Sequence, residues 1–190
     1  MAIILTTIRI TTRHIIQYLK RLILEWYPFD GLEIEERRRR WLLLFFCTIG
    51  LIPLLLYSLL DLIQGNSAES IIEAIAAVWI IVCIYNIQKI GSIEWIYNSI
   101  PATIAALFLY LAYSGGPVGS KSYFSFIFPT ITFFLLGIRR GVLWTLIFFL
   151  GLIFIFLNPL TFLQAYPYQT EAIFRFGVVF FLIAILNYSY

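Results

Sequence analysis

Long apolar stretches separated by short basic or turn-forming segments occupy the chain from Trp41 to Tyr190. A bilayer core of about 30 Å takes roughly 20 residues of α-helix. Six stretches reach or approach this length: 41–63, 68–87, 93–113, 123–137, 141–158 and 171–190. The fourth is the shortest and has Pro129 in its middle, so we expect it to begin earlier or to be kinked. The pattern predicts an all-α fold, a polytopic membrane bundle of six transmembrane helices.

The composition excludes an ordinary soluble domain. Hydrophobic residues make up 62% of the 190 residues, charged residues make up 12%, and the mean hydropathy is +0.93. Soluble domains are about half apolar and a quarter charged. A soluble fold of this length would have no interior large enough for so much apolar surface, so the lipid bilayer is the expected surrounding of the helices.

The basic residues predict how the helices are oriented. If the arginine run before the first stretch is cytoplasmic, eleven of the 13 Lys and Arg lie on that side. They are Arg9, Arg13, Lys20, Arg21, Arg37, Arg38, Arg39, Arg40, Lys89, Arg139 and Arg140. Lys121 and Arg175 remain on the outer side. Because cytoplasmic loops carry an excess of Lys and Arg, we expect both termini to be cytoplasmic. The arginine run and the Arg139–Arg140 pair are the expected topology determinants.

Residues 1–40 form a separate predicted region, a basic cytoplasmic segment before a transmembrane domain over residues 41–190. Apolar residues recur there at helical spacing with basic residues opposite, which is typical of an amphipathic helix at the cytoplasmic interface. The apolar positions are Ile8, Ile15, Leu19, Leu22 and Trp26. A helix packed on a soluble partner domain fits the same pattern. Glu33, Glu35 and Glu36 each precede an arginine by one turn, so we expect the first span to begin as a cytoplasmic helical extension.

Few ionisable residues fall within the apolar stretches, where such residues are costly and usually functional. Asp61 and Glu73 lie near the outer ends of the first and second stretches, and Arg175 lies a turn inside the last. We interpret them as a polar cluster at the outer face, with Asp61 and Glu73 opposite Arg175, and Glu171 four residues before it. The cluster would bind a small ligand or respond to protons. The alternative is structural: acids near helix starts complement the helix dipole, and Glu171 with Arg175 is an ordinary pair one turn apart. The other acids near helix starts are Glu69 and Glu94.

The sequence carries no signature of catalysis or of metal binding. Its one histidine, His14, lies outside the apolar stretches, and its two cysteines, Cys47 and Cys83, lie inside them. Cysteine in such a position behaves as a small hydrophobe. No nucleophile elbow, zinc-binding motif or phosphate-binding glycine loop occurs. We therefore expect no enzymatic activity, metal or cofactor in this chain, and no nucleic-acid partner.

The second half of the sequence contains a series of motifs typical of one family. Residues 114–117 read Ser-Gly-Gly-Pro, residues 123–129 read Tyr-Phe-Ser-Phe-Ile-Phe-Pro, and residues 137–141 read Gly-Ile-Arg-Arg-Gly. Together with the pair Arg175 and Phe176, this pattern resembles the multi-helix membrane region of many bacterial diguanylate cyclases, the GGDEF proteins. The resemblance implies a sensory and anchoring region in the bacterial inner membrane. The last helix would pass a signal from the outer face to a cytoplasmic C-terminal effector.

The cyclase domain with its Gly-Gly-Asp/Glu-Glu-Phe signature is absent from this sequence. The abrupt end at Tyr190, without a polar tail, favours a membrane portion that has been cut at a domain boundary. We expect such a sensor to pair as a homodimer or to join a membrane-complex partner. Two other functions stay open: a small structural subunit that scaffolds a larger membrane complex, and a transporter.

Overall fold

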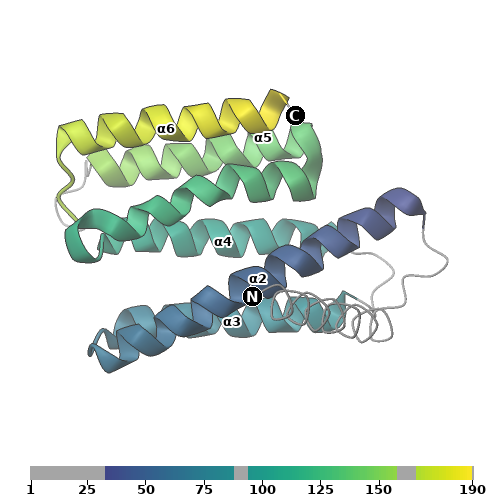
Figure 1. Ribbon diagram of the computed structural model, residues 1–190, viewed down its shortest axis with the longest axis horizontal. Helices are drawn as coiled ribbons and strands as arrows, with labels where there is room; N and C mark the ends of the chain where they lie inside the picture. Colours follow the sequence, from purple (N-terminus) through teal and green to yellow (C-terminus); the bar gives the residue numbers. More distant parts are fainter. Residues whose placement is uncertain (1–32, 88–93, 158–165, 190) are drawn as a thin grey trace, which may run out of the picture. The chain divides into compact units, whose positions relative to one another are not determined.

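The computed structural model describes residues 33–87, 94–157 and 166–189, which are helical apart from short connections (Figure 1). The elements are α2 Ile34–Ile63, α3 Ser67–Asn86, α4 Glu94–Ser114, the 3₁₀ helix η1 Pro117–Phe126, α5 Ile127–Leu157 and α6 Thr170–Ser189. These ranges contain no strand, so the all-α prediction is confirmed for them. Residues from Arg38 to Tyr190 form one compact unit. The predicted amphipathic helix lies outside the described residues.

Among the described residues, five helical segments are long and apolar enough to cross a membrane. They are Ile34–Ile63, Ser67–Asn86, Glu94–Ser114, Gly119–Leu157 and Thr170–Ser189. The prediction of six separate stretches differs at the fourth and fifth, which continue into each other through α5 without a separate loop. Helix α2 begins at Ile34 and includes the arginine run, as the predicted helical extension requires.

The segment Gly119–Leu157 reverses its direction at Gly137. This glycine has φ 74° and ψ 178°, a conformation that essentially only glycine adopts. On either side of it the two arms of α5 pair with each other. Thr132 Oγ1 lies 3.1 Å from Thr145 Oγ1, and the ring centroids of Phe128 and Phe148 lie 4.1 Å apart. The arms therefore form an antiparallel hairpin, which Figure 1 shows in green.

The expected irregularity of the fourth stretch comes from its start. The chain enters it through η1, which begins at Pro117, six residues before the predicted start at residue 123. Pro129 then lies in the first turn of α5, where its missing N–H leaves no hydrogen bond unmade. The stretch therefore begins earlier than predicted, and the proline produces no break.

Aromatic rings form the packed centre between α4, the α5 hairpin and α6. Phe128, Phe148 and Phe180 are each no more than 1% exposed, and together with Leu152 and Ala112 they belong to one cluster of buried residues. The helix sides that face away from this cluster are also apolar, with 38 large hydrophobic side chains exposed among the described residues. Such a surface fits lipid contact, because a water-exposed monomer rarely shows extensive apolar patches.

The two ends of the compact unit carry different polar contacts. At one end, here called the Arg140 end, Arg140 lies 3.9 Å from Glu94, and Arg40 Nη1 donates to the Ile87 carbonyl at 3.1 Å. At the other end, here called the Lys121 end, Lys121 pairs with acids of α2 and α3. Of the predicted topology determinants, Arg40 and Arg140 thus lie at the end away from Lys121. Arg139 and Arg140 belong to the helix after Gly137 and not to a loop.

Candidate functional site

The four predicted site residues separate into two neighbouring sites at the Lys121 end. Asp61 and Glu73 belong to a cluster around Lys121. Glu171 and Arg175 pair with each other at the rim of a pocket beside α6. The predicted placement of Asp61 and Glu73 opposite Arg175 is therefore wrong, because Lys121 takes that position.

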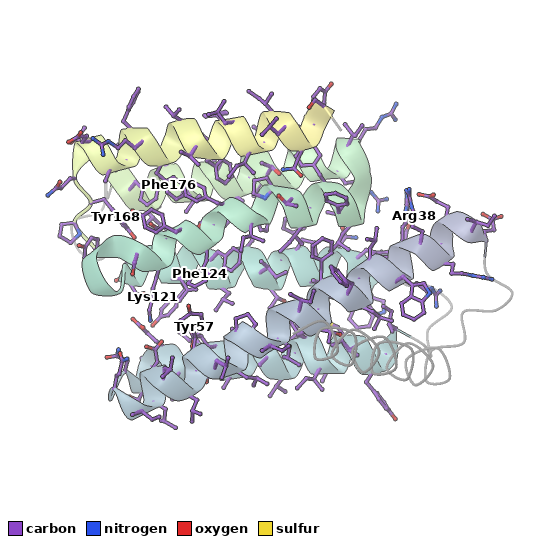
Figure 2. All side chains as sticks on the ribbon, in the orientation of Figure 1. Arg38, Tyr57, Lys121, Phe124, Tyr168 and Phe176 are labelled. Atoms are coloured by element: carbon purple, nitrogen blue, oxygen red, sulfur yellow. The ribbon has the colours of Figure 1, made fainter. Side chains whose placement is uncertain are left out.

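The first site is the acid–lysine cluster, which consists of Asp61, Glu69, Glu73 and Lys121. The Lys121 Nζ donates to Asp61 Oδ2 at 2.8 Å and also to Glu69 Oε2. The side chains of Lys121, Asp61 and Glu69 are 12%, 7% and 17% exposed, so this ion pairing is largely shielded from solvent. Figure 2 shows Lys121 pointing from η1 toward α2 and α3.

Glu73 is the fourth member of the cluster. It is 2% exposed, and it lies within electrostatic range of Asp61, Lys121 and Glu69. Its Oε2 has no hydrogen-bond partner among the described residues. A buried carboxylate without a partner is strongly disfavoured unless its charge is removed or compensated.

A short turn brings the acids of α2 and α3 together. The backbone N–H of Asn66 donates to the Asp61 carbonyl at 2.8 Å, and Gly65 has φ 84°. The Ser58 hydroxyl then donates to the Ser70 carbonyl at 3.0 Å, which holds the two helices side by side. Asp61 in the last turn of α2 thereby meets Glu69 and Glu73 in the first two turns of α3.

A glycine turn directs Lys121 toward these acids. Gly116 has φ 57°, and a Cβ at this position would lie 2.6 Å from Cγ of Lys121. Glycine is therefore needed for the backbone conformation. It is also needed because the aliphatic part of the Lys121 side chain occupies the space that a Cβ would take. The Tyr57 ring of α2 also meets Phe124 of η1 at a centroid distance of 5.3 Å, so η1 contacts α2 through apolar as well as ionic groups (Figure 2).

The second site is a pocket of about 280 Å³ between η1 and α6, here called the aromatic pocket. Its walls include Phe126 of η1, Phe156 of α5, Phe176 of α6 and Tyr168 of the segment before α6. Phe126 stacks on Phe176 at 4.5 Å, and Phe156 meets Phe176 edge-on at 5.0 Å. Polar atoms reach the pocket from Ser122 and from the Glu171–Arg175 pair.

The Glu171–Arg175 pair forms the most polar part of the pocket rim. Arg175 donates to Glu171 one turn earlier in α6, and the two side chains are 76% and 71% exposed. An exposed pair at this spacing contributes only about 0.3–0.5 kcal/mol to stability. Because a guanidinium has five N–H donors, a single acid on one side leaves donors for a further anionic group.

Tyr168 joins the pocket to α4. Its hydroxyl donates to the Ala112 carbonyl at 2.7 Å. Burial raises the pKa of Tyr168 to about 12, although a hydrogen bond with Ser122 acts in the opposite direction. The hydroxyl therefore keeps its proton at physiological pH and remains a hydrogen-bond donor at the base of the pocket.

Neither site resembles a metal centre. The described residues contain no group of three or more His, Cys, Asp or Glu side chains that could hold a metal ion. Cys47 and Cys83 are buried free thiols within α2 and α3.

Lys121 is the residue that the sequence interpretation left out of the site. The sequence contained one signal for it, since Lys121 and Arg175 were the two basic residues on the predicted outer side. No family model, curated protein or solved structure matches the chain. The resemblance to the membrane regions of diguanylate cyclases therefore remains a hypothesis that rests on the sequence motifs.

Proposed function

We propose that the chain is a membrane-embedded sensory and anchoring domain of a bacterial signalling protein. In this proposal a molecule that binds in the aromatic pocket at the outer face shifts α6, and α6 passes the change to a cytoplasmic C-terminal effector. The observation that carries the proposal is that the first half of α6 forms one wall of the pocket, through Arg175 and Phe176. The motifs shared with the diguanylate cyclase membrane regions favour the same class of protein.

The proposed topology has six membrane crossings with both termini in the cytoplasm. The crossings are α2, α3, α4, η1 with the first arm of α5, the second arm of α5, and α6. Two observations support it: the hairpin at Gly137 divides the longest apolar segment into two arms, and Arg40, Arg139 and Arg140 lie in segments away from the Lys121 end. This distribution agrees with an inner, positively charged side.

Topology reporters test these crossings. Fusions at Ser67, Gly116 and Ala165 are expected to report an outer location, and a fusion at Lys89 an inner one, because eleven of 13 basic residues then lie inside. The measurement uses paired reporters that are active on opposite sides of the membrane. An outer signal at Lys89, or an inner signal at Gly116, contradicts six crossings with both termini in the cytoplasm.

The buried residues of α6 connect the pocket to the packed centre. Phe176 and Phe180 are both buried, and both belong to the aromatic cluster that joins α6 to the α5 hairpin. Phe176 also forms the stacked ring pair with Phe126 in the pocket wall. A ligand that separates these rings would bind one position of α6 better than another, which is the requirement for a population shift.

The pocket chemistry favours an amphipathic anion, with its apolar part between the phenylalanine rings and its charged group at Arg175. We use dodecanoate as the probe, with the chain in lipid nanodiscs and calorimetry as the measurement. Arg175→Gln is expected to raise the Kd for dodecanoate by at least about tenfold, because a hydrogen bond to a charged group is worth roughly 1.5–3 kcal/mol.

Two controls accompany this binding measurement. Arg140→Gln removes an exposed arginine at the opposite end and should leave the affinity unchanged. Dodecanol, which has no charge, should bind Arg175→Gln and the unmodified chain equally well. Equal dodecanoate affinity in all three proteins would rule out the pocket as the anion site.

The open alternative is a structural subunit in a larger membrane complex. The exposed apolar side chains of α6, including Phe174, Phe181 and Ile185, would then contact a partner helix. An unchanged dodecanoate response together with stable capture of a second membrane protein would favour this alternative.

A further inference from the structure

The acid–lysine cluster contains more acidic groups than its one basic group can neutralise. Three carboxyl groups, on Asp61, Glu69 and Glu73, face the single ammonium group of Lys121. Lys121 directs its hydrogen bonds to Asp61 and Glu69. Glu73 Oε2 is buried and has no hydrogen-bond partner among the described residues.

A buried carboxylate oxygen without a hydrogen-bond partner can remain in a fold when its charge is removed or compensated. The described residues offer no arrangement of three acids that could hold a metal ion. A proton needs only one oxygen to bind, and it removes the charge whose burial is costly. Among the simple ligands, a proton is thus the one that this geometry accepts.

We propose that the Glu73 carboxyl is a proton-binding site whose occupancy sets how tightly Lys121 holds η1. With the proton bound, the cluster has two carboxylates against one ammonium. When the proton leaves, a third carboxylate faces the same ammonium. The added negative charge increases the attraction of Lys121 to the acids of α2 and α3. Ionisable groups at such positions in membrane helices commonly mark proton sites.

The groups around Glu73 come from each element packed against it. Asp61 faces it from α2, Glu69 precedes it by one turn on α3, and Lys121 reaches it from η1. Tyr110 of α4 lies within electrostatic range of Glu73, Glu69 and Lys121. Tyr113, one turn further along α4, lies within range of Tyr110.

The response would reach the aromatic pocket through the backbone of η1. Lys121 is followed directly by Ser122 and Tyr123, which line the pocket. A change in the strength of the ion pairs of Lys121 would therefore change the position of the neighbouring pocket residues. The proton site itself does not depend on whether the pocket binds a ligand, so the two proposals fail independently.

Infrared spectroscopy of the chain in lipid nanodiscs tests the proton site. A carbonyl band from a protonated carboxyl group is expected, and it should disappear as the pH rises within a range from about 5 to about 9. Glu73→Gln should lack this band, whereas the matched variant Glu69→Gln should retain it. A Glu73→Gln spectrum identical to that of the unmodified chain throughout the range would overturn the proposal.

Acylation of Lys121 provides a second readout that needs no variant. The chain has three lysines, Lys20, Lys89 and Lys121, so mass spectrometry can follow Lys121 against the other two. In the unmodified chain, labelling of Lys121 relative to Lys20 should fall several-fold over the same pH interval in which the infrared band disappears. Relative labelling that stays constant while the band disappears would overturn the link to Lys121.

Discussion

Replacement of Lys121 by methionine is expected to lower the free energy of unfolding by about 3–5 kcal/mol, the cost of breaking a buried ion pair by removing one partner. Methionine fills a similar volume, so the effect comes from charge. Asp61 and Glu69, which are 7% and 17% exposed, would lose their shared cation while Glu73 remains beside them. Reversible unfolding in mixed micelles, followed by tryptophan fluorescence, measures the change.

The matched control removes an exposed cation at the Lys121 end of the unit. Arg175→Met breaks the pair with Glu171, in which both side chains are more than two-thirds exposed, and it should cost no more than about 0.5 kcal/mol. A triple variant that combines Lys121→Met with Asp61→Asn and Glu69→Gln should recover most of the loss, because no uncompensated carboxylate remains in the ion pair. An equal loss for Lys121→Met and Arg175→Met would show that the cluster is not a stabilising centre.

Replacement of Phe148 by alanine is expected to lower the free energy of unfolding by about 3–5 kcal/mol. Phe148 is 1% exposed, and its ring lies 4.1 Å from that of Phe128 and 6.1 Å from that of Phe180. In a bilayer the loss comes chiefly from packing contacts, since lipid tails are as apolar as the protein core. The same unfolding measurement applies.

Phe154 is the matched control for Phe148, because it lies in the same arm of α5 but is 46% exposed. Phe154→Ala should change the stability by less than about 1 kcal/mol, since lipid can occupy the space that the ring leaves. Similar losses for both variants would mean that the α5 hairpin and α6 do not form the packed centre of the unit.

The two sites share one structural element. η1 contributes Lys121 to the acid–lysine cluster on one side and Phe126 to the aromatic pocket on the other. A short 3₁₀ helix has weaker hydrogen-bond geometry than an α-helix, so its position depends strongly on its side-chain contacts. In the proposed sensor, η1 would combine the state of the proton site with the state of the pocket.

The helical segments were predictable because each depends on its own residues. A run of about 20 apolar residues must satisfy its backbone hydrogen bonds internally in lipid, and a helix does so irrespective of the neighbours. The same locality explains why the helical extension through the arginine run could be predicted. The boundary between the fourth and fifth predicted stretches falls at the reversal, where Gly137 adopts the positive φ that glycine tolerates.

The pairing within the site was decided by the tertiary structure alone. Asp61 and Lys121 are separated by 60 positions in the chain, and two cations, Lys121 and Arg175, were candidates on the predicted outer side. Which one meets the acids depends on the rotation of α3 and on the path of η1 after Gly116, and neither follows from periodicity. The helices and the uneven distribution of basic residues could therefore be recognised before the fold was known, because both are local properties. Only the packing of α2, α3 and η1 decided that Lys121 faces Asp61, because an ion pair requires side chains from distant segments to meet within about 4 Å.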